Sequence, residues 1–275
     1  MKKVILSIMM LAFSSSAMYA LVFEDGGFNY RTTGSNTVAL TTGNGEEGYL
    51  GAYSGWSYPV VPETVTYGGI TYTVTSIDDN AFAWSTNMGY VELPNTVEKI
   101  GFQSFNGCTG MTKAVLPGVK IIDSAAYSFC SDLKEVTLGS SLEGIGQTAF
   151  GWCSRLKTVV CEAVVPPVLY TSESVMYGDC FSSASSATLY VPRGSIMAYG
   201  ASDIWGKFKA IVPIDNCMGP SDVNGDGEVN VTDAISLIEL MLNYTDLPAY
   251  YDVNGDGEVN ISDIILLIDG LLNNI

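Results

Sequence analysis

The chain has 275 residues, 47% of them hydrophobic, a formal net charge of −17 and no histidine. This length and composition leave room for one or two domains with packed cores and argue against wholesale disorder. The acidity argues against nucleic acid or an anionic membrane as a partner, because both need surfaces rich in Lys and Arg. It suits cation binding or simple solubility. Without histidine, catalysis would lack the commonest general base and the commonest zinc ligand.

The N-terminus, residues 1–20, is predicted to be an export signal. Two lysines start it, and the apolar run from Val4 to Phe13 is too short to span a bilayer as a stable anchor. Cleavage is expected after Ala17 or Ala20. No later segment reaches about 18 uninterrupted apolar residues, so the mature chain is expected to be secreted and to have no membrane span.

Residues 21–66 are rich in Gly, Thr and Tyr and alternate partially between apolar and polar side chains, as in the run from Thr37 to Leu40. This pattern predicts strands. We expect them to form an N-terminal β cap, because the segment that follows is a repeat array whose open end would be an aggregation-prone edge.

Residues 67–215 carry a repeat with a period of about 23 residues, the signature of a solenoid. Each unit opens with an isoleucine and places an aromatic five residues later. The isoleucines are Ile77, Ile100, Ile122 and Ile145, and the aromatics are Phe82, Phe105, Tyr127 and Phe150. One unit cannot bury its apolar face alone, so stacked units are expected to build a continuous core. The alternation in Leu133-x-x-Val136-x-Leu138 predicts one short strand per coil.

Cysteines occupy one column of this repeat and allow two interpretations. The column consists of Ser85, Cys108, Cys130 and Cys153. These thiols could form a disulfide or metal ladder, or they could be small buried hydrophobic groups. The second interpretation is favoured, because a serine can fill the same place but cannot form a bridge. Cys161 replaces a core leucine and is interpreted in the same way, whereas the sequence leaves open whether Cys180 and Cys217 are free.

The residue before each member of the cysteine column forms a second column of interest. Its members are Trp84, Gly107, Phe129 and Trp152. If these aromatics are exposed, they could form a stacking strip for a sugar or for a side chain of a partner. The alternative is that they close the edge of the solenoid by packing on their neighbours.

The unit I-G-x-x-A-F-x-x-C-x-x-L-x-x-V-x-L, clearest from Ile145 to Cys161, resembles the BspA-type leucine-rich repeat of bacterial surface and secreted proteins. The segments from Gly68 to Ile77 and from Ala187 to Ser195 are similar to the usual start and closing strand of such arrays. The resemblance implies a β-rich leucine-rich-repeat solenoid that is extracellular or attached to the bacterial cell surface. It also implies binding of a protein or a host surface, not chemistry.

Residues 216–220 are predicted to be a linker, and residues 221–275 carry one motif twice, thirty residues apart. The first copy, D-V-N-G-D-G-E-V-N-V-T-D, starts at Asp222, and the second, D-V-N-G-D-G-E-V-N-I-S-D, starts at Asp252. Both match the calcium-loop pattern of an EF-hand at positions 1, 3, 5, 6, 9 and 12. A fortuitous acidic turn could explain one such loop, but not two near-identical ones.

Calcium prefers six to eight hard oxygen ligands, and a loop of this kind supplies them as it curls. Glycine at position 6, which is Gly227 in the first loop and Gly257 in the second, permits the sharp turn. The residue at position 7 should ligate through its carbonyl, and the residue at position 9 directly or through water. The predicted ligands of two calcium ions are Asp222, Asn224, Asp226, Glu228, Asn230, Asp233, Asp252, Asn254, Asp256, Glu258, Asn260 and Asp263. Because several acids converge, calcium binding and folding should be coupled.

Gly219-Pro220 prevents a helix from entering the first loop, so each loop has only an exiting helix, over about 232–243 and 262–272. The duplicated loop–helix pair resembles a type I dockerin, which implies docking onto a cohesin-like scaffold or surface protein. In the best-known clostridial dockerins, positions 10 and 11 are often Ser-Thr and help to recognise the cohesin. The predicted partner-binding residues at these positions are Val231, Thr232, Ile261 and Ser262. The specificity of the clostridial dockerins therefore does not carry over.

Both helices are apolar on more than one side, which fits either packing within the chain or a hydrophobic docking face. The predicted function is a secreted, non-catalytic binding or adhesion protein. The alternative is an accessory component, or less plausibly a hydrolase, of a polysaccharide-degrading complex. A glycoside hydrolase needs two carboxylates about 5 to 9.5 Å apart. The surface acids Glu92, Glu98, Glu135 and Glu143 sit at non-core repeat positions. A third possibility is a purely structural module that calcium stabilises.

Overall fold

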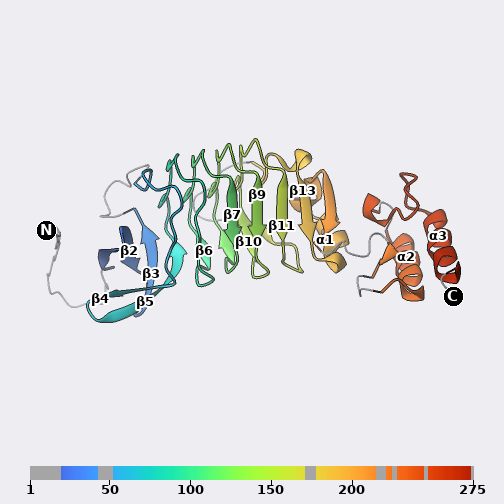
Figure 1. Ribbon diagram of the computed structural model, residues 1–275, viewed down its shortest axis with the longest axis horizontal. Helices are drawn as coiled ribbons and strands as arrows, with labels where there is room; N and C mark the ends of the chain where they lie inside the picture. The colour runs from blue at the N-terminus through green and yellow to red at the C-terminus, as the bar shows by residue number, and fades with distance from the viewer. Residues whose placement is uncertain are drawn as a thin grey trace.

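The computed structural model describes residues 20–42, 52–170, 178–214, 221–224, 228–244 and 247–273. N-terminal strands, a stack of coils and a pair of C-terminal helices follow one another along its long axis (Figure 1). Apart from residue 20, the predicted export signal lies outside the described residues.

The N-terminal strands form a sheet that covers the first coil. They are β1 (Val22–Asp25), β2 (Phe28–Thr32), β3 (Thr37–Thr41), β4 (Thr64–Tyr67) and β5 (Ile70–Ile77). Strands β1, β2 and β3 are antiparallel, β3 runs parallel to β5, and β4 pairs with β5 in the antiparallel sense. Glycine pairs make the tight turns, with φ of +58° and +86° at Gly26 and Gly27 and of +60° and +82° at Gly68 and Gly69.

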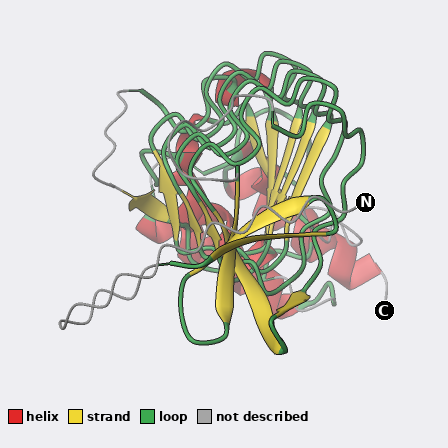
Figure 2. Ribbon diagram, turned by 90° about the vertical axis from the view of Figure 1, so that its left-hand side faces the viewer, coloured by secondary structure: helices red, strands yellow, loops and turns green. Residues whose placement is uncertain are grey.

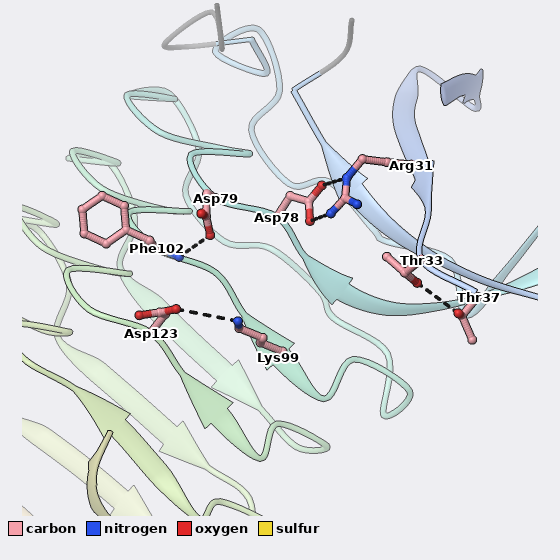
Figure 3. Close-up of polar contacts among 8 residues, drawn as sticks. All are labelled: Arg31, Thr33, Thr37, Asp78, Asp79, Lys99, Phe102 and Asp123. Atoms are coloured by element: carbon pink, nitrogen blue, oxygen red, sulfur yellow. Dashed lines mark hydrogen bonds and ion pairs between the residues drawn. The ribbon is translucent and has the colours of Figure 1, made fainter. Parts of the chain in front are cut away.

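Polar contacts join these strands to the first coils (Figure 3). Arg31 of β2 donates two hydrogen bonds to the carboxylate of Asp78, at 2.8 and 2.6 Å. In the next layer the carboxylate of Asp79 accepts from the backbone N–H of Phe102 at 2.8 Å. The bidentate geometry at Arg31 fixes the direction of approach of the sheet, although its partial exposure makes the energetic contribution small.

Two parallel ladders of strands build the solenoid, and its coils superimpose when viewed along the stack (Figure 2). One ladder continues from β5 through β6 (Lys99–Ile100), β8 (Ile121–Ile122), β10 (Gly144–Gly146) and β12 (Val168–Tyr170). The other contains β7 (Lys113–Leu116), β9 (Glu135–Leu138), β11 (Thr158–Cys161), β13 (Thr188–Val191) and β14 (Ala210–Pro213). The predicted strand per coil is the one in the second ladder. The opening isoleucines contribute a further short strand that the sequence analysis did not anticipate.

The aromatic column forms a ladder of stacked rings in the core. Successive ring centroids are 4.9, 4.8, 5.1 and 5.0 Å apart, and the ring planes are within 8° of parallel. The members are Phe82, Phe105, Tyr127, Phe150 and Phe181. The last ring was missed in the sequence, because an insertion separates it from the regular repeat.

The cysteine column is buried and free, as the favoured interpretation predicted. Each thiol donates a hydrogen bond to the carbonyl of the aromatic residue in the preceding coil. The pairs are Cys108 with Phe82, Cys130 with Phe105 and Cys153 with Tyr127, at 3.1, 3.2 and 3.2 Å. Ser85 stands in the first coil, where no earlier ring of the column exists, and its buried hydroxyl has no hydrogen-bond partner. Cys161 and Cys180 are also buried and free, whereas Cys217 lies outside the described residues.

The last coil extends beyond the predicted closing strand. After β13 come the 3-10 helix η2 (Arg193–Ser195), α1 (Ile196–Gly200), η3 (Trp205–Lys207) and then β14, which adds a fifth strand to the ladder. The fully buried Trp205 donates its indole N–H to the carbonyl of Pro167 at 2.8 Å. A further 3-10 helix, η1 (Ala184–Ser186), precedes β13.

The C-terminal domain consists of two helices, α2 (Val231–Asn243) and α3 (Ile261–Asn273), each preceded by one of the predicted loops. The short helix η5 (Ala249–Tyr251) leads into the second loop. Both helices have nearly the same burial pattern. Ala234 and Leu237 of α2 are buried, as are their counterparts Ile264 and Leu267 in α3.

Candidate metal centre and partner face

The second loop is described from end to end, and it curls around the carboxylate of Asp252. This carboxylate accepts from the backbone N–H groups of Gly255, Asp256 and Gly257, at 2.6, 3.2 and 2.8 Å. Gly257 has a φ of +92°, the left-handed conformation that glycine adopts without steric cost. The sharp turn predicted for position 6 is therefore present.

The middle of the loop is held by the next two polar side chains. Asn254 accepts from the N–H of Asp256 at 2.8 Å, and Asp256 accepts from the N–H of Glu258 at 2.9 Å. The backbone hydrogen bond from Glu258 is the main cause that lowers the pKa of Asp256, and the side chain of Asn254 adds to it. Asp256 therefore stays ionised to lower pH than a free aspartate does.

The aspartate at position 12 closes each loop and caps the helix that follows. Asp263 is fully buried, and its two oxygens accept from Val253 N–H at 2.7 Å and Asn260 N–H at 2.7 Å. Asn260 in turn accepts from the N–H of Ser262 at 2.8 Å. These reciprocal bonds form a capping box at the start of α3. Ligation by Asp263, as predicted, would have to use its remaining lone pairs.

The first loop repeats this arrangement where it is described. Asp233 is fully buried and accepts from Asn230 N–H at 2.8 Å and Asn224 N–H at 3.1 Å. Asn230 accepts from Thr232 N–H at 2.8 Å. Of the other predicted ligands, Asp222 and Glu228 are described, whereas Asp226 lies outside the described residues.

The donor chemistry of the loops fits calcium. Carboxylate and amide oxygens of Asp252, Asn254, Asp256 and Asn260 lie within one curled segment, and these hard ligands suit calcium. Where the chain is described, His, Cys, Asp and Glu side chains do not gather into a metal-binding group of three or more. Instead, backbone amides hold the carboxylates in place. Calcium, when bound, would supply the positive charge that offsets the mutual repulsion of the loop acids.

Two family comparisons match separate parts of this architecture. Residues 64–189 match the BspA type leucine rich repeat region in six copies, and residues 220–272 match the dockerin type I domain. The chain contains a BspA-type leucine-rich repeat region and a type I dockerin domain. Dockerin type I domains are known calcium binders, in agreement with the oxygen-rich loops described above.

Several solved structures of leucine-rich repeat proteins are similar to this chain. A leucine-rich repeat protein from Bacteroides ovatus is 25% identical, with 73% of this chain and 51% of that chain covered and a TM-score of 0.49. Another leucine-rich repeat protein, from Bacteroides capillosus, is 27% identical, with 50% of this chain and 96% of that chain covered and a TM-score of 0.41. The leucine-rich repeat protein of T. pallidum is 19% identical, with 83% of this chain and 96% of that chain covered and a TM-score of 0.46. No curated protein matches the chain.

The predicted partner face of the dockerin is open to solvent. Val231 is 63% exposed and Ile261 is 67% exposed. Of the adjoining hydroxyl residues, Thr232 is exposed and Ser262 is half-buried. Further along the helices, Ile235 and Ile265 are also exposed. Packing between the helices therefore covers only part of their apolar surface. None of the helices in the described segments is long and apolar enough to cross a membrane.

The aromatic strip of the solenoid is exposed as well. Trp84, Phe129 and Trp152 are 47%, 44% and 49% exposed, and Phe129 stacks on Trp152 with centroids 4.6 Å apart. All three have positive φ, between +56° and +61°, where the fourth member is Gly107. Bulky residues adopt this conformation at an energetic cost. Trp84 lies so close over Gly107 that a Cβ there would be 2.8 Å from its ring, so part of the strip does pack on its neighbours.

The glutamates that the sequence analysis placed on the surface are Glu92, Glu98, Glu135 and Glu143, and all four are exposed. Glu98 forms an ion pair with Lys120 at 2.9 Å on this surface. Their exposure agrees with the predicted solvated positions.

The last coil contacts the dockerin through Arg193, and the sequence did not indicate this contact. Arg193 is only 5% exposed and reaches Asp222, the first residue of the first loop, which is 2% exposed. It also donates a hydrogen bond to the hydroxyl of Tyr250. These partners lie 29 and 57 residues away, so no repeat or motif could have indicated the contact.

Proposed function

We propose that this protein is a secreted, non-catalytic binding protein displayed on a bacterial scaffold or surface. The dockerin binds two calcium ions through the ligand set given above and then docks onto a cohesin-type partner. The solenoid captures a protein or a glycan. The composition supports this proposal, because the chain is strongly acidic and without histidine. The predicted export signal and the two families also support it.

The observation that carries the docking proposal is the duplicated, solvent-exposed face of the dockerin. Each helix presents one branched apolar residue and one hydroxyl at its first turn, Val231 and Thr232 in α2 and Ile261 and Ser262 in α3. Directly behind each pair, a buried aspartate fixes the turn, so both faces are rigid. An exposed apolar residue on a rigid turn is typical of a surface that a partner covers.

A pull-down from the envelope and culture fluid of the producing cells tests the proposal. The bait is the mature full-length protein, in calcium or in chelator. We expect a partner that is retained only in calcium and that is lost with the double substitution Val231→Asp and Ile261→Asp. Charged residues there would be buried without compensation in the complex.

A matched control separates this face from general loss of apolar surface. Val164 and Val165 of the solenoid are 69% and 74% exposed, so the double substitution Val164→Asp and Val165→Asp should leave the partner bound. Equal recovery with both variants, or no calcium-dependent partner at all, would contradict the docking role. Circular dichroism with added calcium must show that both variants keep their helices.

The aromatic strip is the candidate ligand surface of the solenoid. Three large side chains stand in a left-handed conformation that glycine would adopt more easily, so some benefit must offset that cost. Stacking between Phe129 and Trp152 supplies part of it. The exposed faces of these rings also offer a packing surface for a saccharide or for an aromatic side chain of a partner. If the ligand is a polysaccharide, the protein would serve as an accessory component of a polysaccharide-degrading complex.

Affinity electrophoresis through gels that contain soluble xylan, mannan or β-glucan tests this second role. Retardation by one of these polymers should be lost in the double variant Phe129→Ser and Trp152→Ser. The matched control is Tyr58→Ser, because Tyr58 is 74% exposed but lies outside the strip. Unchanged retardation in the double variant would exclude the strip as the glycan site. If no polymer retards the wild type, the strip would instead be tested against protein partners retained in chelator.

A further inference from the structure

The guanidinium of Arg193 lies between the solenoid and the dockerin. Arg193 begins η2, directly after β13 and Pro192, and it is 5% exposed. A buried arginine needs partners for its charge and its N–H groups, since an unpaired one is costly. The side chain of Arg193, which the last coil of the solenoid carries, reaches partners in the dockerin.

One nitrogen of Arg193 connects to both halves of the dockerin. Its Nη1 donates to the backbone carbonyl of Asp222 at 2.6 Å and to the hydroxyl of Tyr250. Its Nε lies 3.9 Å from the carboxylate of Asp222, and Cζ lies 5.7 Å from the centre of the Tyr250 ring. Asp222 opens the first loop, and Tyr250 stands two residues before Asp252, which opens the second. The start of each loop is therefore held by the same side chain.

This contact makes two near-identical loops unequal. Asp222 is 2% exposed beneath Arg193, whereas its counterpart Asp252 is half-buried and turned toward the amides of its own loop. The sequences of the two loops contain no such difference. It arises because Arg193 contacts the first residue of the first loop directly, whereas it reaches the second half through Tyr250, which precedes the loop.

The remaining interface is loosely packed. Beside Tyr250 lies a cavity of about 620 Å³, lined on the solenoid side by Met197, Phe208 and Ile211. Tyr244 and Leu247 of the dockerin line its other side. Because these apolar surfaces do not close on each other, they contribute little to the position of the domain. Small interfaces between domains leave relative motion as the default. The polar contacts of Arg193 are then what fixes the orientation.

We propose that the C-terminal end of the solenoid is a docking surface for the chain's own dockerin, and that Arg193 fastens it there only when the loops are calcium-loaded. The proposal rests on the calcium binding of the dockerin but not on its cohesin-type partner. Calcium orders the start of each loop, which brings the Asp222 carbonyl and the Tyr250 hydroxyl within reach of one guanidinium. Val231 and Ile261, the apolar residues of the predicted cohesin-binding face, stay exposed in this arrangement.

Small-angle X-ray scattering of the full chain tests this docking. In calcium, the wild type should behave as one rigid particle. Arg193→Ala should raise the maximum dimension by on the order of 10 Å, the root-mean-square reach of a linker as short as 215–220. Arg193→Lys should resemble the alanine variant, because an ammonium cannot reproduce the planar, multi-donor contact. Chelator should give the wild type the same increase.

The matched control is Arg155→Ala. Arg155 is an exposed arginine of the solenoid that pairs with Asp132 at 2.8 Å, and its loss should not change the scattering. Wild-type scattering from Arg193→Ala in calcium would overturn the proposal. So would chelation that melts the helices without enlarging the particle.

A calcium titration followed by circular dichroism separates this inference from the proposed function. Arg193→Ala should still gain helix on calcium addition, which shows that its dockerin folds while undocked. If the wild type takes up no calcium, the calcium-binding role itself is contradicted, and the calcium-dependent docking falls with it.

Discussion

The solenoid and the dockerin are held together by different kinds of interaction. In the solenoid, like residues stack on like across five coils, with rings 4.8 to 5.1 Å apart and a hydrogen-bonded ladder on two sides. In the dockerin, the buried apolar side chains are few, among them Leu237 and Leu267, and much of the order lies in carboxylates that accept backbone N–H groups. From this comparison we expect the solenoid to be stable without a metal and the dockerin to depend on calcium.

The largest expected effect comes from the centre of the ring ladder. Tyr127→Ala removes a buried ring that stacks on both neighbours, so we expect a loss of about 3 to 5 kcal/mol in the unfolding free energy of the solenoid. Urea unfolding followed by tryptophan fluorescence measures it. The exposed Tyr58→Ala should stay within about 0.5 kcal/mol of the wild type. A comparable loss of calcium affinity in Tyr127→Ala would contradict the independence of the two regions.

A smaller effect is expected at the caps of the dockerin helices. Asn260→Ala removes the side chain that accepts from Ser262 N–H at 2.8 Å and is also a predicted calcium ligand, so the lost cap alone should cost about 1 kcal/mol of dockerin stability and the lost ligand should add to it in calcium. Asn230→Ala should cost about the same, since it breaks the equivalent bond to Thr232. Asn260→Ser keeps a capping oxygen and should lose much less. Thermal melts at 222 nm check this series, and a shift of the solenoid transition instead would contradict it.

The smallest effect is expected from the cysteine column. Burial raises the pKa of Cys108 and of Cys153 to about 12, so almost no thiolate forms near neutral pH. In a Cys217→Ser background, iodoacetamide at pH 8 should label none of the buried thiols until denaturant is added. Chelator should leave this protection unchanged, because the column lies in the solenoid. Mass spectrometry of the intact chain counts the adducts, and rapid labelling of the native protein would show that the column opens.

How far the sequence predicted this architecture depended on periodicity. Four members of the ring ladder, the strand at Glu135–Leu138 and the turn at Gly257 follow from fixed spacings and are present. Phe181 was not predicted because the insertion after Cys161 breaks the period, although Cys180-Phe181 stands in place of the A-F pair of the repeat unit. The two-residue strands were missed because Ile-Ile or Lys-Ile is too short to show alternation.

The contacts between the solenoid and the dockerin could not be predicted from the repeat pattern. Arg193 meets Asp222 and Tyr250 only because the chain places the end of one fold against the start of another. The loop motif predicts oxygen ligands, but it does not predict that Asp263 uses both oxygens to accept backbone N–H groups. That role comes from the capping box, in which a predicted ligand also caps the helix.

Differential scanning calorimetry of the full chain, in calcium and after chelation, tests the division between the two regions most directly. We expect two transitions, of which only the dockerin transition moves when calcium is removed. Each site should contribute about 2.7 kcal/mol at a calcium concentration a hundredfold above its Kd. A dockerin transition that does not respond to calcium, or a solenoid transition that shifts by the same amount, would contradict the account.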